Sequence, residues 1–190
     1  RPVDKSVEQP FYFTKAPQTL TASGATVAYP AKTKNYHFEM EMVVAIGKAG
    51  CRVSAEDAHT LVYGYAAGLD MTRRDLQLVA RDKGRPWDLG KDVEQSSVCS
   101  EIVPMKGLII ENGPISLEVN GQTKQSSNVD KLIWNVREII ADLSLFYHLQ
   151  PGDLIYTGTP EGVGPVVPGD KITGRIDGVA EVALTVGAPK

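Results

Sequence analysis

Several short segments of the chain, most of them apolar, are separated by turns rich in glycine and proline. They are typical of β-strands, and the clearest are 38–46, 115–119, 122–126, 153–157, 171–176 and 181–186. Asn120-Gly121 separates the second from the third and predicts a two-residue hairpin turn. We expect the last two segments to pair antiparallel, with three side chains facing inwards: Val182, Leu184 and Val186.

Two other segments carry apolar residues at helical spacing. In the first, a capping box at 54–57 precedes apolar positions that recur over 58–68. The second extends over 129–146 and is followed by the helix-breaking pair Pro151-Gly152. Many strands interrupted by two helices predict an α+β, mostly β fold rather than a doubly wound sheet.

The composition of the 190 residues is that of an ordinary globular protein, with 42% hydrophobic and 23% charged residues. It excludes a disordered chain, a coiled coil and a collagen-like repeat, and the length favours one domain over 1–190. The net charge is −3 and the lysines and arginines are scattered, so we expect no nucleic-acid partner and no membrane partner. The first residues lack the apolar core of a signal peptide, so we expect a cytoplasmic protein.

The segment 37–46 carries the first candidate chemistry. Side chains alternate along a strand, so His37, Glu39 and Glu41 share one face, while Phe38 and Met40 lie on the other. An unbroken apolar run follows, which indicates a strand buried on both faces. Two carboxylates in such a strand need compensation, which a hard divalent cation would provide. The segment alone also fits a half-exposed strand whose glutamates are solvated.

A third carboxylate, Asp70, follows the first predicted helix and would complete a set with Glu39 and Glu41. A set of oxygen ligands alone suits Mg²⁺ or Mn²⁺ better than zinc. Taken singly, Asp70 also fits the N-cap of a helix, and Arg74 fits a surface ion pair.

Two loops carry further candidates. Lys91 follows a glycine in a mixed loop, where a lysine is usually solvated. The run 158–164 is rich in glycine but lacks the pattern of a nucleotide-binding P-loop, and it fits either a tight hairpin loop or a cradle for a carboxylate. The chain has neither a GxSxG nucleophile motif nor an HExxH zinc motif.

Five segments, in this order along nearly the whole chain, together resemble the fumarylacetoacetate hydrolase family: 11–15, 37–41, 68–77, 83–91 and 152–164. Five ordered motifs are more specific than any one of them. The chain is most similar to the short, single-domain acylpyruvase branch of this family. The resemblance implies a β-roll or β-sandwich with the site among its strands, two peripheral helices and assembly as a homodimer.

The resemblance also implies roles for individual residues. It assigns a divalent metal, Mg²⁺ or Mn²⁺ with Ca²⁺ as a third option, to three carboxylates: Glu39, Glu41 and Asp70. It implies that Lys91 is the catalytic residue. It places four further side chains against the substrate: Arg74, Gln77, Thr159 and Lys15.

The implied reaction is the hydrolysis of a carbon–carbon bond in an acylpyruvate, a β-diketo acid, and the expected substrate is fumarylpyruvate. Lys91 and Arg74 would stabilise the charge of the departing pyruvate enolate. Lys91 would also move a proton if its pKa is lowered. The alternatives are decarboxylation or tautomerisation of oxaloacetate, hydration of a dienoate, and a non-catalytic metal-binding module.

The family pattern also includes a His and a Glu in a mobile N-terminal lid. The ten residues before Phe11 contain no His, and Glu8 alone does not make this pair. We expect the encoded protein to extend upstream of Arg1 by roughly a few tens of residues that carry both groups. Without such a segment, His37 is the first candidate for the base that activates water.

Overall fold

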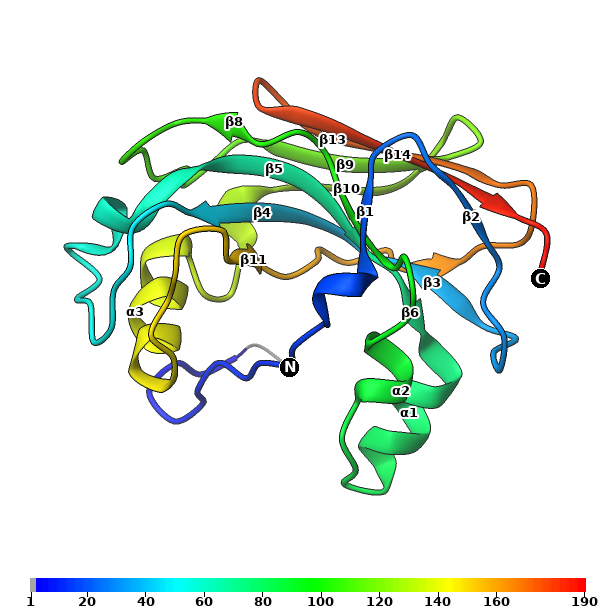
Figure 1. Ribbon diagram of the computed structural model, residues 1–190, viewed down its shortest axis with the longest axis horizontal. Helices are drawn as coiled ribbons and strands as arrows, with labels where there is room; N and C mark the ends of the chain where they lie inside the picture. The colour runs from blue at the N-terminus through cyan, green and yellow to red at the C-terminus, as the bar shows by residue number, and fades with distance from the viewer. Residues whose placement is uncertain (1–2) are drawn as a thin grey trace.

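The computed structural model describes residues 3–190 and is built mainly of strands, arranged in two packed layers (Figure 1). The first layer is a sheet with the order β1-β7-β5-β4-β11, in which β8 also pairs with β5. Its strands are β1 (Leu20–Ala22), β4 (Met40–Ile46), β5 (Val62–Asp70), β7 (Ser97–Cys99), β8 (Val103–Pro104) and β11 (Leu154–Tyr156).

The second layer is a five-stranded sheet with the order β10-β9-β13-β14-β2. Its strands are β2 (Thr26–Ala28), β9 (Pro114–Val119), β10 (Gln122–Asn128), β13 (Lys171–Ile176) and β14 (Ala180–Gly187). A small third sheet joins β12 (Gly164–Pro165), β3 (Tyr36–Phe38) and β6 (Thr72–Arg73).

The helices lie on the side of the first sheet that faces away from the second (Figure 1). One end of the molecule carries α1 (Arg74–Asp82) and α2 (Asp88–Lys91), and the other carries α3 (Val136–Phe146). Short 3₁₀ turns are η1 (Pro17–Thr19), η2 (Ala58–Leu61) and η3 (Val129–Lys131). None of the helices in the described part of the chain has the length and apolar character needed to cross a membrane.

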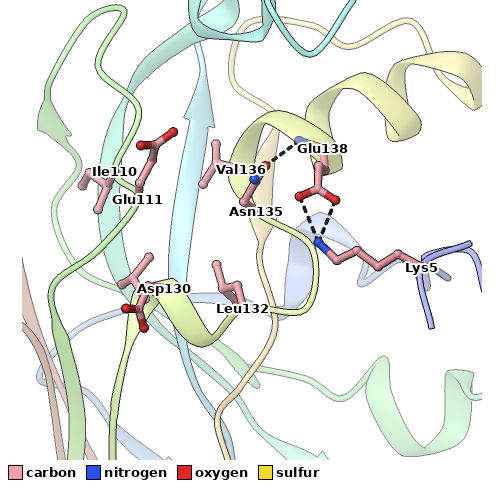
Figure 2. A pocket seen from close by; sticks show the side chains of 9 residues that line it. Lys5, Ile110, Glu111, Asp130, Leu132, Asn135, Val136 and Glu138 are labelled. Atoms are coloured by element: carbon pink, nitrogen blue, oxygen red, sulfur yellow. Dashed lines mark hydrogen bonds and ion pairs between the residues drawn. The ribbon is translucent and has the colours of Figure 1, made fainter. Parts of the chain in front are cut away.

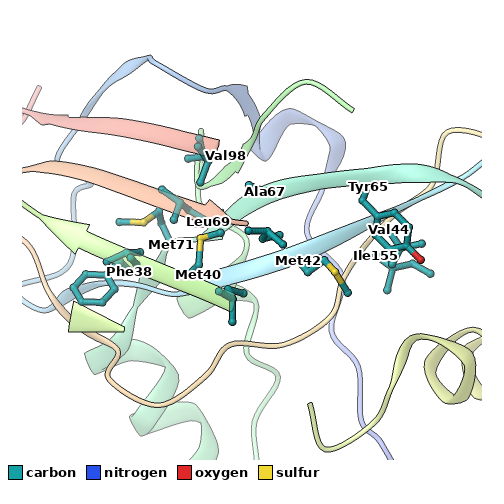
Figure 3. Close-up of a cluster of buried hydrophobic side chains, with 14 of the residues drawn as sticks. Phe38, Met40, Met42, Val44, Tyr65, Ala67, Leu69, Met71, Val98 and Ile155 are labelled. Atoms are coloured by element: carbon teal, nitrogen blue, oxygen red, sulfur yellow. The ribbon is translucent and has the colours of Figure 1, made fainter. Parts of the chain in front are cut away.

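The hydrophobic core lies between the two sheets (Figure 3). Phe38, Met40 and Met42 enter it from one face of the segment 36–46, as the alternation predicts. The whole of β4 is buried, so the prediction of a strand covered on both faces is confirmed. The side chains predicted to face inwards from β14 are also buried: Val182, Leu184 and Val186.

The predicted hairpins are confirmed. Asn120 and Gly121 have φ values of 52° and 77°, the left-handed values that a type I′ turn needs, and β9 pairs antiparallel with β10 across them. Likewise β13 pairs antiparallel with β14. The prediction of a mostly β fold is therefore correct, with three α-helices in the described residues instead of two.

The first predicted helix is wrong. Its beginning is only the 3₁₀ turn η2, and the chain then runs through the first sheet as β5. A strand buried on both faces is apolar throughout, so helical spacing alone does not distinguish it from a buried helix. Gly64 allows β5 and the neighbouring strand β8 to approach closely, because a Cβ there would clash with the carbonyl oxygen of Val103.

The second predicted helix is shorter than its apolar pattern. It begins at Val136, because the side chain of Asn135 accepts a hydrogen bond from the backbone N–H of Glu138 and caps the first turn. The upstream part of the pattern forms η3 instead, which is separated from α3 by the stretch 132–135.

The apolar pattern of the sequence does not predict α1. Its signals are present but modest: Asp75 in the first turn, Arg81 in the last, and Gly84 with φ 62° just after the end. The helix buries only Gln77 fully, so it lacks the apolar stripe by which helices are usually found.

Candidate metal centre and active site

Three carboxylates meet where β4 and β5 pair. Glu41 lies opposite Gly68, and the backbone N–H of Asp70 donates to the carbonyl oxygen of Glu39 at 2.9 Å. One carboxylate oxygen from each of Glu39, Glu41 and Asp70 lies within 4.8 Å of the other two. All three residues are buried, so the alternative of glutamates on a solvated face is wrong, and Asp70 ends a strand rather than capping a helix.

Lys91 is the last residue of α2, and its side chain is only 2% exposed. Gly90 lets α2 pack tightly on α1, because a Cβ there would lie 2.8 Å from the Cβ of Gln77. The ammonium of Lys91 donates to Glu39 Oε2 at 2.9 Å and to Asp70 Oδ2 at 2.8 Å. The alternative of a solvated loop lysine is therefore wrong.

Two further cations border the carboxylates. Lys15 donates to Asp70 Oδ1, and Arg74, the first residue of α1, donates from Nη2 to Glu39 Oε1. Glu41 differs from the other two carboxylates, because it forms no ion pair with any residue in 3–190. Its Oε2 accepts the backbone N–H of Gly158 at 2.8 Å.

The pKa values of the carboxylates follow this difference. Burial raises the pKa of Glu41 well above its ordinary value, and the charges of Asp70 and Glu39 raise it further. Burial also raises the pKa of Glu39. At Asp70 burial acts in the same direction, but Lys15 and Lys91 outweigh it, so the pKa is lowered. Glu41 is therefore the carboxylate of this cluster that neighbouring positive charges compensate least.

The lysines shift in opposite directions. Burial lowers the pKa of Lys91, but the charges of Asp70 and Glu39 outweigh it, so the pKa is raised. These two carboxylates therefore favour the ammonium form of Lys91. Burial lowers the pKa of Lys15 by more than the charge of Asp70 raises it.

Arg74 is held from three sides. Besides Glu39, it donates from Nη1 to Gln77 Oε1 and from Nε to His37 Nδ1, the latter at 3.4 Å. The other ring nitrogen of His37 lies 2.9 Å from Asn35 Oδ1. Burial and the charge of Arg74 lower the pKa of His37 to about 4, so its ring is neutral. His37 lies on the predicted side of the strand, and each of its ring nitrogens has a polar partner.

The glycine-rich loop after β11 approaches the carboxylates from another direction. Thr157 Oγ1 donates to the carbonyl oxygen of Met42 at 2.7 Å, which attaches the loop to β4. Thr159 Oγ1 accepts a hydrogen bond from Nε2 of Gln125 at 2.9 Å. The sequence does not mark Gln125 as a site residue, because a single glutamine in a polar strand carries no signal that it is buried.

Aromatic side chains border the cluster beside Lys91. The Phe13 ring centroid lies 4.9 Å from Lys91 Nζ, and Trp87 packs against Phe11 and Phe13 with ring centroids 5.4 and 5.8 Å apart. These rings line a cavity of about 530 Å³ together with Tyr12, Thr14, Pro86, Asp88 and Tyr147. The cavity therefore adjoins the charged cluster at Phe13.

A second cavity, of about 210 Å³, lies at the start of α3, where Lys5 reaches Glu138 (Figure 2). Its lining also includes Ile110, Glu111, Val129, Asp130, Leu132, Asn135 and Val136. None of the predicted site residues lines it. The cluster around Glu41 is therefore the better candidate for chemistry.

The donor set of this cluster fits a hard divalent cation. It consists of carboxylate oxygens without His or Cys, which suits Mg²⁺, Mn²⁺ or Ca²⁺ better than zinc. Glu41 adds a second sign of fit, because a carboxylate with a raised pKa and no ion pair is stabilised by an added positive charge. Glu39, Glu41 and Asp70 are the residues able to hold it.

Comparison with known proteins places the chain in a family. The family model described as fumarylacetoacetate (FAA) hydrolase C-terminal matches residues 1–187. The chain belongs to the fumarylacetoacetate hydrolase family. Within this family it is 80% identical over 187 residues to a fumarylpyruvate hydrolase from a Ralstonia species, which covers 98% of this chain and 97% of the relative.

Two further matches have lower sequence identity. The chain is 38% identical over 183 residues to a mitochondrial oxaloacetate tautomerase from Bos taurus, covering 96% of this chain and 83% of the relative. The crystal structure of fumarylpyruvate hydrolase from Pseudomonas aeruginosa in complex with Mn²⁺ and pyruvate superposes with a TM-score of 0.92 at 46% identity. That match covers 97% of this chain and 82% of the other, and it confirms the predicted fold type.

Proposed function

We propose that this protein hydrolyses the carbon–carbon bond of an acylpyruvate, and that its substrate is fumarylpyruvate, which it cleaves to fumarate and pyruvate. The observation that carries the proposal is the 80% identity to a fumarylpyruvate hydrolase over almost the whole chain. The buried cluster supports it, because an acylpyruvate presents the oxygen-rich, anionic groups that a carboxylate-bound metal and three cations would recognise.

In this proposal Glu39, Glu41 and Asp70 hold Mg²⁺ or Mn²⁺, with Ca²⁺ as a further option. The Mn²⁺ and pyruvate in the related Pseudomonas aeruginosa enzyme support this assignment. When bound, the cation supplies Lewis-acid polarisation of the substrate's 2-oxo group and carboxylate.

The chain's own groups bind and orient the substrate. Lys91, Arg74 and Lys15 place positive charge around the site, and the hydroxyl of Thr159 faces the carboxylate of the pyruvoyl group. Gln77 Oε1 accepts a hydrogen bond from Nη1 of Arg74 and so holds the guanidinium in place. Lys91 contributes its positive charge, which lies against Glu39 and Asp70.

The reaction consumes one water. The water oxygen bonds to the distal carbonyl carbon, and the bond between that carbon and the pyruvate methylene then breaks. The electron pair of that bond leaves with pyruvate as its enolate, which takes up a proton at the methylene carbon. The other product is the free carboxylic acid. Lys91 and Arg74 are the groups that stabilise the charge developing on the enolate oxygen.

Oxaloacetate tautomerisation is a second candidate, because relatives that carry it are 35–38% identical to this chain over nearly its whole length. Both reactions pass through the enol of a 2-oxo acid, so the cluster around Glu41 serves either. The higher identity to the fumarylpyruvate hydrolase favours hydrolysis.

A direct rate comparison tests the proposal. Purified protein loaded with Mn²⁺ is given fumarylpyruvate, a neutral acylpyruvate such as acetylpyruvate, and oxaloacetate, and the loss of each enol absorbance is followed. We expect fumarylpyruvate to react fastest and to release pyruvate and fumarate in equal amounts. A faster reaction with oxaloacetate would overturn the proposal in favour of tautomerisation or decarboxylation.

We also infer that the enzyme works as a homodimer in the cytoplasm on a small diffusible substrate, without a nucleic-acid or membrane partner. The family resemblance supports the homodimer, and the scattered charges support the lack of a nucleic-acid partner. Light scattering on the eluting protein measures the assembly, and a monomeric mass at micromolar concentration would contradict it.

A further inference from the structure

The side-chain amide of Gln125 connects two parts of the site that are far apart in the sequence. Gln125 is 1% exposed, whereas its neighbours Lys124 and Ser126 on β10 are exposed. The pairing of β10 with β9 shifts between Thr123 and Gln125, so Lys124 is the extra residue of a β-bulge. Bulges redirect side chains, and this one turns Gln125 into the protein.

Three hydrogen bonds use the amide of Gln125. Its Oε1 accepts the backbone N–H of Met40 at 3.0 Å, and its Nε2 donates to Thr159 Oγ1 at 2.9 Å and to the carbonyl oxygen of Pro160 at 2.8 Å. A backbone N–H only donates and a carbonyl only accepts, so one orientation of the amide satisfies all three partners. Met40 lies between two of the carboxylate residues, Glu39 and Glu41.

The hydrogen bond from Gln125 also determines whether the hydroxyl of Thr159 donates to or accepts from a further partner. A hydroxyl has one hydrogen to donate and two lone pairs that accept. One lone pair of Thr159 Oγ1 is taken by Gln125, and no group in 3–190 accepts the hydroxyl hydrogen. Thr159 is therefore presented as a hydrogen-bond donor, which suits a carboxylate or carbonyl oxygen.

The backbone around the bulge supports the loop in the same place. Gly162 has φ 97°, and a Cβ on it would lie 2.3 Å from the carbonyl oxygen of Lys124, the bulged residue. The glycine therefore allows the loop to rest directly on β10. Together with the Pro160 contact, this places the loop against the bulge at two points.

We propose that Gln125 is a positioning residue, which presents the Thr159 hydroxyl as a donor to the substrate's carboxylate and fixes the loop to the segment that carries Glu39 and Glu41. The inference rests on the proposed function in one respect, the identity of the group that Thr159 binds. Gln125 acts through Thr159 and touches neither the substrate nor the metal.

The variant Gln125→Glu tests this role. An ionised glutamate still accepts the N–H of Met40, but it has no hydrogen to donate and draws the hydroxyl hydrogen of Thr159 towards itself. Oxalate, a stable dianion that resembles the pyruvate enolate, serves as the probe in calorimetric titrations with Mn²⁺ present. We expect the Kd of oxalate and the KM of fumarylpyruvate to rise about tenfold to a hundredfold, since the lost hydrogen bond involves a charged group. The Kd of Mn²⁺ should not change.

A cycle with Thr159→Val separates positioning from simple charge repulsion. If Gln125 acts through Thr159, Gln125→Glu changes the Kd of oxalate much less in the Thr159→Val background than in the unchanged protein. Equal effects in both backgrounds, or a parallel loss of Mn²⁺ and oxalate affinity, would overturn the proposal.

Two further variants complete the design. Gln122→Glu makes the same chemical change at an exposed position of the same strand and should leave both affinities unchanged. Gln125→Met, uncharged and similar in volume, should reproduce the loss of oxalate affinity, so the test does not depend on one variant folding. If the cycle behaves as expected but fumarylpyruvate is not hydrolysed, the positioning role stands and the proposed substrate fails.

Discussion

The two faces of the segment 36–46 are both buried, but they are buried in opposite ways. One face carries Phe38, Met40 and Met42, whose side chains belong to the hydrophobic core between the sheets (Figure 3). The other face carries Glu39 and Glu41, which lie within a cluster of charged side chains. The segment therefore carries both a packing surface and a charged site.

The two faces contribute to the stability and to the chemistry of the protein in different ways. On the apolar face a residue contributes through its volume, and a smaller side chain leaves a cavity. On the charged face a residue contributes through its charge, and removing one member changes the energy of all the others. Substitutions on the two faces should therefore have different signatures, and the following predictions are ordered by the size of the expected effect.

The largest effect is expected from Glu41→Gln. The amide oxygen still accepts the N–H of Gly158, but the charge that would hold the metal is gone. We expect Mn²⁺ binding to be lost and kcat/KM to fall by at least about 1,000-fold, because a Lewis acid supplies several kcal/mol of stabilisation. The melting temperature should not fall, since burial disfavours the charge that the substitution removes.

Calorimetric titration with Mn²⁺ and thermal unfolding check this prediction. Glu118→Gln, the same change at an exposed position of β9, serves as the control and should behave as the unchanged protein. An unaltered affinity for Mn²⁺ in Glu41→Gln would move the metal away from this cluster.

Lys91→Met should reduce both activity and stability. We expect kcat to fall about 100-fold to 1,000-fold, as happens when one group that stabilises a developing negative charge is removed. In metal-free protein the substitution also leaves Glu39 and Asp70 without their shared ammonium, which costs about 3–5 kcal/mol of unfolding free energy. Saturating Mn²⁺ should restore much of that stability.

Steady-state kinetics and urea unfolding, with and without Mn²⁺, measure the two effects of Lys91→Met. Lys83→Met changes an exposed lysine near the end of α1 and is the control. A near-normal kcat would exclude Lys91 from the chemistry, and equal stability without metal would exclude the ion pairs.

Met42→Ala tests the apolar face. Its side chain is 1% exposed in the core, so we expect a loss of about 2–5 kcal/mol in unfolding free energy from the cavity that remains. Well below the melting temperature, the affinity for Mn²⁺ and the KM should be those of the unchanged protein. A large loss of Mn²⁺ affinity in the folded variant would show that the two faces of the strand are coupled.

The smallest effect concerns pH and His37. Its pKa in the folded protein, about 4, is below its ordinary value of 6.5, so the unfolded chain takes up a proton first as the pH falls. The contribution of His37 is therefore fully present above about pH 6.5 and is lost progressively down to about pH 4. Glu41, whose pKa is raised, acts with the opposite sign, so the comparison must be made against a variant.

His37→Gln is the appropriate variant, because an amide can both donate to Asn35 and accept from Arg74. Melting temperatures measured from pH 7 to 5 should fall less steeply for the variant than for the unchanged protein. Parallel slopes would mean that His37 titrates normally in the folded state.

The strands and the carboxylates were predictable because both follow from local pattern. Alternation alone places Glu39 and Glu41 on one face and Met40 on the other, and the Asn120-Gly121 turn defines its own hairpin. The family motifs then imply the grouping of these glutamates with Asp70, and the pairing of β4 with β5 shows how that grouping arises.

The remaining features depend on contacts between distant elements, which no local pattern reports. Lys91 is buried because Gly90 brings α2 onto α1, and the raised pKa that follows was not predictable from a lysine in a loop. Gln125 owes its place to a single bulged residue in β10. The strand β5 was mistaken for a helix because full burial removes the alternation that marks a strand.

Two strand pairings in the described residues are parallel, and they have a consequence for how the protein folds. Thr26 in β2 pairs with Thr185 in β14, so one edge of the second sheet joins segments from near opposite ends of the chain. In the same way β1 pairs with the distant β7. Such contacts form slowly, because a long loop must close before any hydrogen bond is gained. During synthesis, the edge of β2 that pairs with β14 stays unpaired until β14 has left the ribosome. An unpaired strand edge favours aggregation during this interval.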